Sequence, residues 1–379
     1  MTRPSPSPAP QEGAPGMYPL NAWYAAAWDT EVGRTLLPRT ICERPVVLYR
    51  TSEGTPVALA DACWHRLVPL SMGRLDGDNL VCGYHGVTYG PNGRCTRMPA
   101  QETLNPSAAV TSYPVVERHR YVWIWPGDPD KADPDLVPDL HWNDDPAWAG
   151  DGERIELDCD YRLVVDNLMD LTHEQFLHAD SLANDELSDA EPDVAHDEDS
   201  VTLTRWMHGI EAPPFLAMQL RRKAPEYRGP VDRWQIIRFT APATITIDVG
   251  VAPVGTGAPE GDRSAGVNGH VLNTITPAGP GSCHYFWAFT RNYHLGDQGL
   301  TNLLRQNVSR VFGQDTDMLN AQQRAIEANP DHEFYNLNID IGGMWARRII
   351  DAKVAAEQGR ERTHPTALAS VAATTRRSA

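Results

Sequence analysis

Short stretches of alternating apolar and polar positions dominate the chain from Tyr18 to about Pro126 and predict β-strands. Two hairpins are expected, because turn-forming residues separate the paired runs at 44–50 and 55–61, and at 87–90 and 94–97. The aromatic and β-branched residues of 115–127 predict one further strand. This first region is therefore predicted to be all-β.

The rest of the chain mixes both kinds of element. A strand over 153–163 is expected to lead into a helix from Val164 to Ala179. Further strands are predicted at 199–209, 232–252, 269–277 and 283–293, and long helices at 299–329 and 344–358. The predicted class is α+β, with a second domain in which a twisted antiparallel sheet wraps around a long C-terminal helix.

Composition suggests where the domains begin and end. Residues 1–16, rich in Pro, Ser and Ala, are predicted to be a disordered tail, and 358–379 a flexible one. Prolines and aspartates crowd residues 127–149, which we interpret as a linker. This leaves domains at 17–126 and 150–357, as the length of 379 residues allows.

Charge and apolar content exclude some classes of function. The formal net charge of −17 repels phosphate backbones, which argues against nucleic-acid binding and is compatible with a basic redox partner. No stretch approaches the roughly 20 apolar residues of a membrane helix, and the start has no apolar signal region, so no membrane is expected. Six cysteines are too few for a disulfide scaffold, which favours a reducing cytoplasm.

Two short motifs carry the strongest chemical signal. Cys63-x-His65 and Cys82-x-x-His85 lie 16 residues apart, each just after a predicted strand. A Rieske [2Fe–2S] cluster binds one iron through two thiolates and the other through two imidazoles, so each loop must offer one of each. The alternative is a Cys₂His₂ zinc site, but zinc sites usually pair Cys with Cys and His with His. The motifs therefore predict a Rieske cluster.

A second metal site is predicted on the helix that begins at Val164. Non-heme iron oxygenases hold Fe(II) with two histidines and one carboxylate. On an ideal helix His173 and His178 lie roughly 140° apart, with Asp170 between them, and so wide an angle indicates a distorted helix. Two such histidines alone are more often surface or core residues. The upstream cluster favours iron, because an electron-transfer centre needs an acceptor.

Several blocks of this sequence resemble the vanillate O-demethylase oxygenase subunits, which are Rieske non-heme iron oxygenases, and more distantly dicamba monooxygenase. They are NAWYAAAW, the two cluster loops, VVERHRYVWIWPGDPDKADPDLVP, CDYRLVVDNLMDLTHEQFLHA, APPF, VDRWQIIRF and SCHYFWAFTRNY. The resemblance spans roughly residues 17–355. It implies a Rieske [2Fe–2S] domain followed by a helix-grip catalytic domain with mononuclear iron.

The resemblance also implies roles for individual residues. Cys63 and Cys82 would bind one cluster iron and His65 and His85 the other, while His173, His178 and Asp315 would bind the catalytic iron. Asp315 follows Gln314, where the family usually has an acidic residue. Asp170 matches the carboxylate that links a cluster histidine of one subunit to an iron-ligand histidine of the next, which implies a homotrimer. Asn167 would support the iron site.

The reaction and substrate follow from the resemblance as well. It implies O₂-dependent O-demethylation of an aromatic acid, most simply vanillate to protocatechuate and formaldehyde, within lignin catabolism. Electrons would come from NADH through a flavin and iron–sulfur reductase. The substrate-contacting positions of dicamba monooxygenase fall at Ile247, Asn273 and Gln306, each of which could instead be packing. The substrate carboxylate has four candidate partners, which are Arg162, Arg221, Arg222 and Arg238.

Other functions stay open at this point. Syringate, a methoxybenzoate or a toluenesulfonate could replace vanillate, since substrate choice depends on the pocket lining. A Rieske electron carrier would need only about the first 110 residues, so the remaining chain argues against it. A binding module without catalysis is a third possibility.

Overall fold

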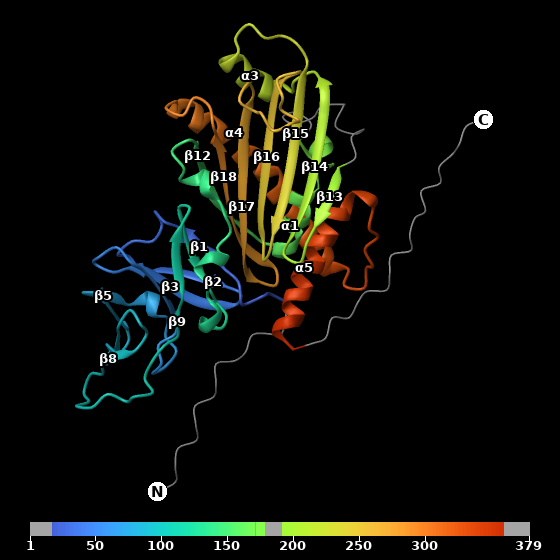
Figure 1. Cartoon of the computed structure of the whole chain (residues 1–379). Helices are drawn as coiled ribbons and strands as arrows, with labels where there is room; N and C mark the ends of the chain where they lie inside the picture. Colours follow the sequence, from blue (N-terminus) through green and yellow to red (C-terminus); the bar gives the residue numbers. More distant parts are fainter. Residues whose placement is uncertain (1–16, 171, 179–191, 360–379) are drawn as a thin grey trace.

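The computed structural model describes residues 17–170, 172–178 and 192–359 (Figure 1). The tail predicted at 1–16, and all but the first two residues of the tail predicted at 358–379, lie outside these residues. Three small antiparallel sheets form the N-terminal part, with strand orders β1-β11-β10, β2-β3-β4-β9 and β5-β6-β7-β8. Their bounds are β1 Tyr24–Trp28, β2 Leu37–Ile41, β3 Arg44–Arg50, β4 Pro56–Ala60, β5 Arg74–Asp76, β6 Asn79–Val81, β7 Thr88–Tyr89, β8 Cys95–Arg97, β9 Ser112–Tyr113, β10 Val115–Arg118 and β11 Tyr121–Ile124.

The two predicted hairpins are confirmed as β3–β4 and β7–β8. The single strand predicted within 115–127 is wrong, because β10 and β11 form a third hairpin. His119 and Arg120 form its two-residue turn, with φ of 56° and 65°. Positive φ at both positions matches the twist of paired strands but is rare outside Gly, Asn and Asp, so the sequence gives no turn signal here.

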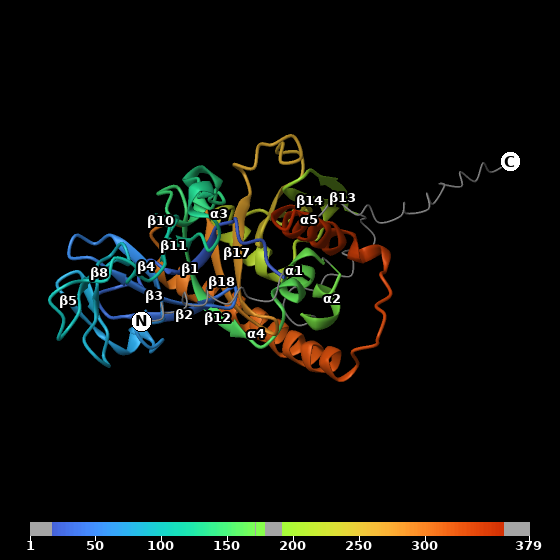
Figure 2. The ribbon, with the colours of Figure 1, turned by 90° about the horizontal axis from the view of Figure 1, so that it is seen from below.

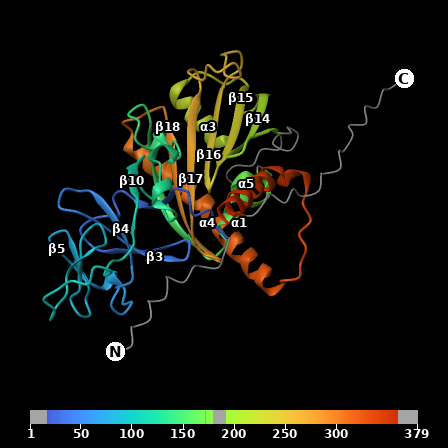
Figure 3. The same ribbon diagram turned by 60° about the horizontal axis from the view of Figure 1, so that its bottom comes forward.

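A seven-stranded antiparallel sheet dominates the C-terminal part, in the order β12-β18-β17-β16-β15-β14-β13. Its strands are β12 Ala149–Leu157, β13 Asp193–His196, β14 Ser200–Ile210, β15 Val231–Thr240, β16 Thr244–Pro253, β17 Val267–Gly279 and β18 Ser282–Arg291. The helices are α1 Tyr161–Met169, α2 Glu174–Leu177, α3 Pro214–Lys223, α4 Gln298–Ala328 and α5 Ile341–Glu357. In Figures 2 and 3 the sheet curves around α1, α4 and α5, which confirms the predicted α+β class.

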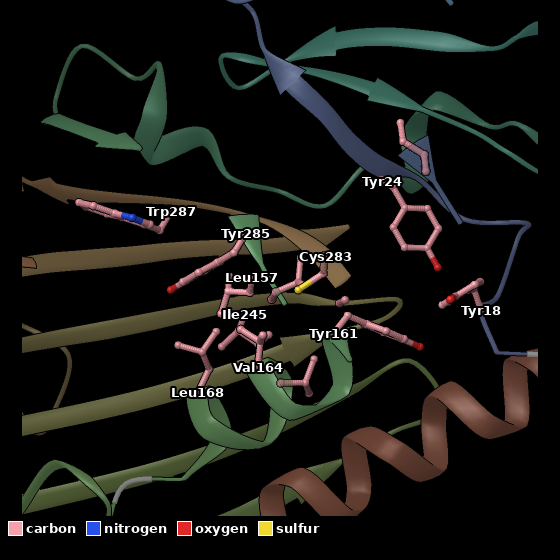
Figure 4. Packing of buried hydrophobic residues seen from close by; sticks show 14 of the residues in the cluster. Tyr18, Tyr24, Leu157, Tyr161, Val164, Leu168, Ile245, Cys283, Tyr285 and Trp287 are labelled. Atoms are coloured by element: carbon pink, nitrogen blue, oxygen red, sulfur yellow. The ribbon is translucent and has the colours of Figure 1, made fainter. Parts of the chain in front are cut away.

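The period of two along each strand decides which side chains meet the helices. Val201 and Leu203 of β14 and Ile237 of β15 belong to one buried cluster with α1 and α5, so they mark the inner face of the sheet. Figure 4 shows the same packing from α1, where Val164 and Leu168 approach Ile245, Tyr285 and Trp287 of the sheet. Burying these side chains stabilises the fold by about 1.5–3 kcal/mol for each large one. The inner face therefore holds the main core.

Backbone pairing and shared core residues join the two parts of the molecule. The Cys42 N–H donates to the Pro277 carbonyl at 2.7 Å, and the Thr276 hydroxyl donates to the Ala25 carbonyl at 2.7 Å. Two buried apolar clusters contain residues from both parts. The end of the β17–β18 hairpin is thus hydrogen-bonded to the N-terminal part.

The proline-rich segment at 127–149 is folded rather than extended. It forms three short 3₁₀ turns, at Pro129–Lys131, Pro134–Leu136 and His141–Asn143. Val137 and Leu140 are buried in a cluster that also includes residues of both parts. The composition is interpreted as that of a linker, but it does not reveal that two apolar residues fix the segment to the core. No helix among the described residues is long and apolar enough to cross a membrane.

Candidate metal centres

The two cysteine–histidine loops close in the same way. The Cys63 N–H donates to the Val68 carbonyl at 2.9 Å, and the Cys82 N–H donates to the Val87 carbonyl at 2.8 Å. Each loop therefore closes five residues after its cysteine. The second follows β6 and returns into β7, as the predicted position after a strand requires. Two loops of matching shape can each present one thiolate and one imidazole to a shared cluster.

Both loops contain a left-handed residue at the same place. The residue four positions after each cysteine donates its N–H back to the cysteine carbonyl, at 2.7 Å for Leu67 and 3.0 Å for Gly86. Their φ angles are 58° and 74°. Glycine adopts such a φ readily, whereas an L-residue loses roughly 1 kcal/mol. The backbone of the first loop is therefore strained at Leu67, whereas the second loop has a glycine at this position and is not strained.

The four predicted ligands form a buried pair and an exposed pair. Cys63 and Cys82 are each 2% exposed, whereas His65 and His85 are exposed, with ring centroids 4.8 Å apart. Within the described chain, no three of these four place ligand atoms within 4.8 Å of one another, as a single zinc ion would require. This spread, with sulfur inside and nitrogen outside, fits a cluster of two irons.

Tyr89 supports the cysteine side and was not identified from the sequence. Its buried hydroxyl accepts a hydrogen bond from the Trp64 N–H at 3.1 Å and lies 3.1 Å from Cys63 Sγ. With its acceptor capacity used by Trp64, the hydroxyl can donate to the sulfur. Burial, followed by the contact with Cys63, holds the pKa of Tyr89 above its ordinary value, so the hydroxyl keeps its proton. A donor to a cluster sulfur is one way in which proteins set a cluster's reduction potential.

The single helix predicted from Val164 to Ala179 is wrong in its middle. α1 ends at Met169 and α2 begins at Glu174, while Ala179 lies outside the described residues. Asp170 has extended backbone angles, φ −99° and ψ 123°. Its carboxylate accepts the Thr172 N–H at 2.7 Å and the His173 N–H at 3.2 Å. These local hydrogen bonds compete with the helix, as short acidic side chains often do.

The break brings three potential metal ligands together. One ligand atom each from His173, His178 and Asp315 lies within 4.8 Å of the others. Nε2 of His178 is 3.2 Å, and Nε2 of His173 3.6 Å, from Asp315 Oδ1. His178 and Asp315 are 1% and 5% exposed. Two imidazoles and one carboxylate on one side of an ion form the donor set of non-heme Fe(II) oxygenases, so these residues fit such an iron.

Hydrogen bonds to the remaining atoms orient the three side chains. His173 Nδ1 lies 2.9 Å from the Asp170 carbonyl, and His178 Nδ1 lies 2.8 Å from Gln314 Oε1. Both rings therefore direct Nε2 toward Asp315. Asn167 donates to Asp315 Oδ1 at 3.1 Å, close to the site as predicted. In the sequence Gln314 stands out only because the family usually has an acidic residue there. In the structure Gln314 is the hydrogen-bond partner of His178.

The surroundings of both imidazoles at this site raise their pKa values. Burial lowers the pKa of His178, but hydrogen bonding and attraction to Asp315 outweigh it, so the pKa lies above its ordinary value. The pKa of His173 is raised in the same way by Asp170 and Asp315 against burial. Metal binding must therefore displace protons, which makes it depend on pH.

Asp170 lies between the iron-ligand candidates and the molecular surface. Its carboxylate is 3.6 Å from His173 Nδ1. It also lines a hollow of about 500 Å³, bordered by α1, α4 and residues 334–347. The exposed side chains of Phe334 and Tyr335 line the same hollow. In Figures 1 and 2 the β5–β8 sheet lies far from α1, so the chain's own cluster loops do not approach this hollow.

The predicted substrate positions differ in their surroundings. Ile247 is half-buried on the inner face. Asn273 is fully buried, donates to the Ile245 carbonyl at 3.0 Å and accepts from the Tyr285 hydroxyl at 2.7 Å. Its amide is therefore largely engaged within the sheet. Gln306 is exposed on α4 nine residues before Asp315, about 180° around a regular helix, so the structure does not bring these two together.

None of the four arginines considered for the substrate carboxylate is both buried and free. Arg162 is paired with Asp160 at 2.8 Å, and Arg222 with Asp297 at 3.2 Å. Arg221 and Arg238 are exposed, and Arg238 donates to the Ser200 hydroxyl at 3.3 Å. These four arginines are therefore poorly placed to bind a substrate carboxylate.

Comparison with known proteins agrees with both centres. Residues 22–114 match the Rieske [2Fe-2S] domain family, and residues 157–356 match the family of the vanillate O-demethylase oxygenase C-terminal domain. The chain is 41% identical to the vanillate O-demethylase oxygenase subunit of Pseudomonas sp. (strain HR199 / DSM 7063), across 90% of this chain and 96% of that protein. It is 38% identical to the toluene-4-sulfonate monooxygenase iron–sulfur subunit TsaM1 of Comamonas testosteroni, across 90% and 99%.

A solved structure shows the same architecture. The crystal structure of dicamba monooxygenase with non-heme iron and dicamba superposes with a TM-score of 0.79 at 32% identity, covering 91% of this chain and 99% of that one. The chain belongs to the vanillate O-demethylase oxygenase family of Rieske oxygenases. It is the oxygenase component of such an enzyme, with a Rieske [2Fe–2S] cluster and a mononuclear non-heme iron as its cofactors.

Proposed function

We propose that this oxygenase removes the methyl group from an aromatic methyl ether that carries a carboxylate, with vanillate as the first candidate. The observation that carries the proposal is the iron-type triad His173, His178 and Asp315, combined with the similarity to vanillate O-demethylase oxygenase subunits. One methyl ether, one O₂, two electrons and two protons give one phenol, one formaldehyde and one water. When bound, the iron and the cluster supply the O₂ activation and the electrons for this reaction.

The protein's own residues would supply position and orientation. His173, His178 and Asp315 are proposed to hold the iron, and Asn167 and Gln314 to fix the direction of Asp315 and His178 through the hydrogen bonds described above. Cys63, His65, Cys82 and His85 are proposed to hold the cluster. The domain limits 17–126 and 150–357 are proposed on the same basis, supported by the family matches within them.

A ring of protomers, taken to be a trimer, is proposed to complete the electron path. Exposed His65 and His85 are accompanied by exposed apolar side chains at Leu67, Met72 and Tyr84. An exposed apolar surface around an imidazole edge suits contact with another protein. The hollow beside Asp170, lined by exposed aromatic side chains, is a surface that could receive it. Asp170 would then lie between a neighbour's cluster histidine and His173.

The proposed partners follow from this chemistry. NADH electrons would arrive through a separate flavin and iron–sulfur reductase, which could dock on the strongly acidic surface. We also propose a cytoplasmic location, a role in lignin-derived aromatic catabolism, and substrate contacts by Ile247 and Asn273, but not by Gln306, which faces away from Asp315. A second candidate reaction is methyl hydroxylation of an aryl sulfonate, supported by the 38% identity to the toluene-4-sulfonate monooxygenase subunit.

Formaldehyde release tests the proposal directly. The purified holoenzyme, a compatible reductase, NADH and O₂ are combined with vanillate, syringate, 3-methoxybenzoate and toluene-4-sulfonate. We expect formaldehyde and a phenol in equal amounts from vanillate, and three irons per chain. If another ether released formaldehyde and vanillate did not, that ether would replace vanillate as the proposed substrate. Two irons per chain and no O₂ consumption with any compound would overturn the oxygenase assignment itself.

A further inference from the structure

Among the described residues, three arginines point from the inner face of the large sheet, and only one of them has hydrogen-bond partners there. Arg291 is 0% exposed and donates to the carbonyls of Ala149, His294 and Asp297 and to the Thr301 hydroxyl, at 2.8–3.2 Å. Both of its Nη atoms are therefore hydrogen-bonded, to β12, the loop after β18 and the start of α4, and only Nε is buried without a partner. A buried guanidinium normally finds such partners, because leaving it without them costs several kcal/mol.

Arg205 of β14 and Arg233 of β15 have no such partners. They are 4% and 5% exposed, yet Nε and Nη1 of each are buried without a hydrogen-bond partner. Neither forms an ion pair with a residue in the described part of the chain. Gln235, opposite Arg205 in the sheet, likewise has a buried Oε1 with no donor. Unsatisfied polar groups thus gather at one place on the inner face.

The register of the strands places this group beside the iron site. Arg205 lies two residues after Leu203, and Arg233 two before Gln235, so all four side chains share the inner face. Gln235 Nε2 donates to the Glu174 carboxylate at 3.1 Å. Glu174 directly follows His173, one of the three iron-ligand candidates. The two guanidinium groups therefore face α2, on the side of the sheet that carries the triad.

The two guanidinium groups form no ion pair with a carboxylate among the described residues. Burial lowers the pKa of both arginines, and repulsion by Arg205 contributes to the lowering at Arg233. Glu174 attracts both, and Asp170 attracts Arg205, but Glu174 is hydrogen-bonded to Gln235 and Asp170 to Thr172 and His173. A bound anion would satisfy the buried N–H donors that these carboxylates leave unpaired.

We propose that Arg205 and Arg233, with Gln235, form the anion subsite that binds the carboxylate of the aromatic substrate. The inference rests on the proposed function, and it replaces the four arginines suggested by the sequence. A guanidinium pair can hold a carboxylate through several N–H donors at once, which fixes the plane of the ring as well as its position. The acid end of the substrate then lies against β14 and β15, and its other end is directed along the inner face toward His173, His178 and Asp315.

Ligand binding to three variants of the iron-loaded holoenzyme tests the subsite. The probes are vanillate and unsubstituted benzoate, with vanillyl alcohol and benzyl alcohol as uncharged counterparts, measured by calorimetry without O₂. We expect Arg205→Met and Arg233→Met each to weaken binding of both acids roughly 10- to 100-fold, because each removes a charged hydrogen-bond donor. Binding of the alcohols should change less than about twofold. Arg238→Met, on the exposed face of β15, is the matched control and should change neither.

Thermal unfolding separates a binding role from a structural one. Removal of an unpaired buried charge should leave the Tm of Arg205→Met and Arg233→Met at or above that of the parent protein. Arg291→Met removes a satisfied arginine and should lower the Tm by several degrees. A lower Tm for all three variants, or equal weakening of acids and alcohols, would show that Arg205 and Arg233 are structural.

The outcomes also separate this inference from the proposed function. Loss of acid binding in both variants, with no formaldehyde from any methoxybenzoate, would keep the anion subsite and overturn the demethylase. Formaldehyde from vanillate with an unchanged KM in both variants would keep the demethylase and overturn the subsite.

Discussion

The cluster loops and the iron-type triad are two candidate metal sites that are built in opposite ways. The cluster candidates come from two loops within 23 residues of sequence, and the two histidines are exposed. The triad combines α1–α2 with α4, about 140 residues later, and His178 and Asp315 are buried. An exposed imidazole edge suits electron exchange by contact, whereas a buried triad keeps water from the reaction. The position of each centre therefore matches the role proposed for it.

Substitution of Asp170 should break the link between the two regions. Asp170→Asn retains one side-chain oxygen, which can still accept the Thr172 N–H, but it loses the second oxygen, which accepts the His173 N–H, and the charge next to His173. We expect both centres to stay filled while turnover falls at least about 100-fold. Iron content, the visible spectrum of the cluster and formaldehyde release are the measurements. Loss of one iron per chain would instead make Asp170 a scaffold of the triad.

Substitution of Gln314 should weaken the buried iron site and leave the exposed cluster site unchanged. Gln314→Leu removes the acceptor for His178 Nδ1, so the ring is no longer fixed with Nε2 toward Asp315. We expect iron affinity, measured by competition with a chelator, to fall roughly 10- to 100-fold with an unchanged cluster spectrum. Gln314→Glu should retain the affinity. Asp317→Asn, exposed on the same helix, is the control, and an equal loss there would contradict a specific role for Gln314.

Tyr89 is the corresponding test on the cluster side. Tyr89→Phe removes a hydrogen bond to Cys63 Sγ that stabilises the more negative, reduced cluster. One hydrogen bond of about 1 kcal/mol corresponds to roughly 40 mV for a one-electron couple, so the reduction potential should fall by about that amount. Protein-film voltammetry measures it. Tyr49→Phe, whose buried hydroxyl bonds to the Asp78 carbonyl, should leave the potential unchanged.

The smallest expected effect compares the two cluster loops with each other. Gly86→Ala forces a Cβ into a left-handed position 3.3 Å from the Pro99 side chain and should destabilise the loop by about 1 kcal/mol. Leu67→Gly makes the first loop like the second and should change stability by less than about 0.5 kcal/mol, because Leu67 is exposed. Thermal unfolding followed at the cluster absorption measures both. Equal destabilisation by Gly86→Ala and Leu67→Gly would contradict a purely backbone origin of the difference between the two loops.

The same contrast explains what the sequence could predict. The sequence identifies the four cluster ligands because their spacing and their residue types form a pattern within a short stretch of chain. These are Cys63, His65, Cys82 and His85. His173 and His178 are visible as a pair, but Asp315 needed a family resemblance, since no local pattern joins residues so far apart. The break at Asp170 was indicated only by the wide angle between the histidines, because an Asx-type hydrogen bond overrides apolar periodicity.

Four other residues near the two sites were not identified from the sequence, for a different reason. Arg205 and Arg233 occupy positions whose neighbours two residues away face the core, so strand alternation marks them as inward-pointing charges. That signal is present in the sequence but is visible only once the inner face is known. Gln314 and Tyr89 could not be found in this way, because their contacts with His178 and Cys63 depend on how separate elements pack.

The joint between the two parts has a consequence for electron delivery. Main-chain pairing from Cys42 to Pro277 and apolar clusters that cross the boundary leave no hinge between the cluster and its own catalytic sheet. A carrier that swings on a tether would slow down in a viscous solvent, because each electron would wait for a large movement. Here the distance between the cluster loops and the catalytic sheet of the same chain is fixed by the fold, so electron delivery should not depend on solvent viscosity in that way.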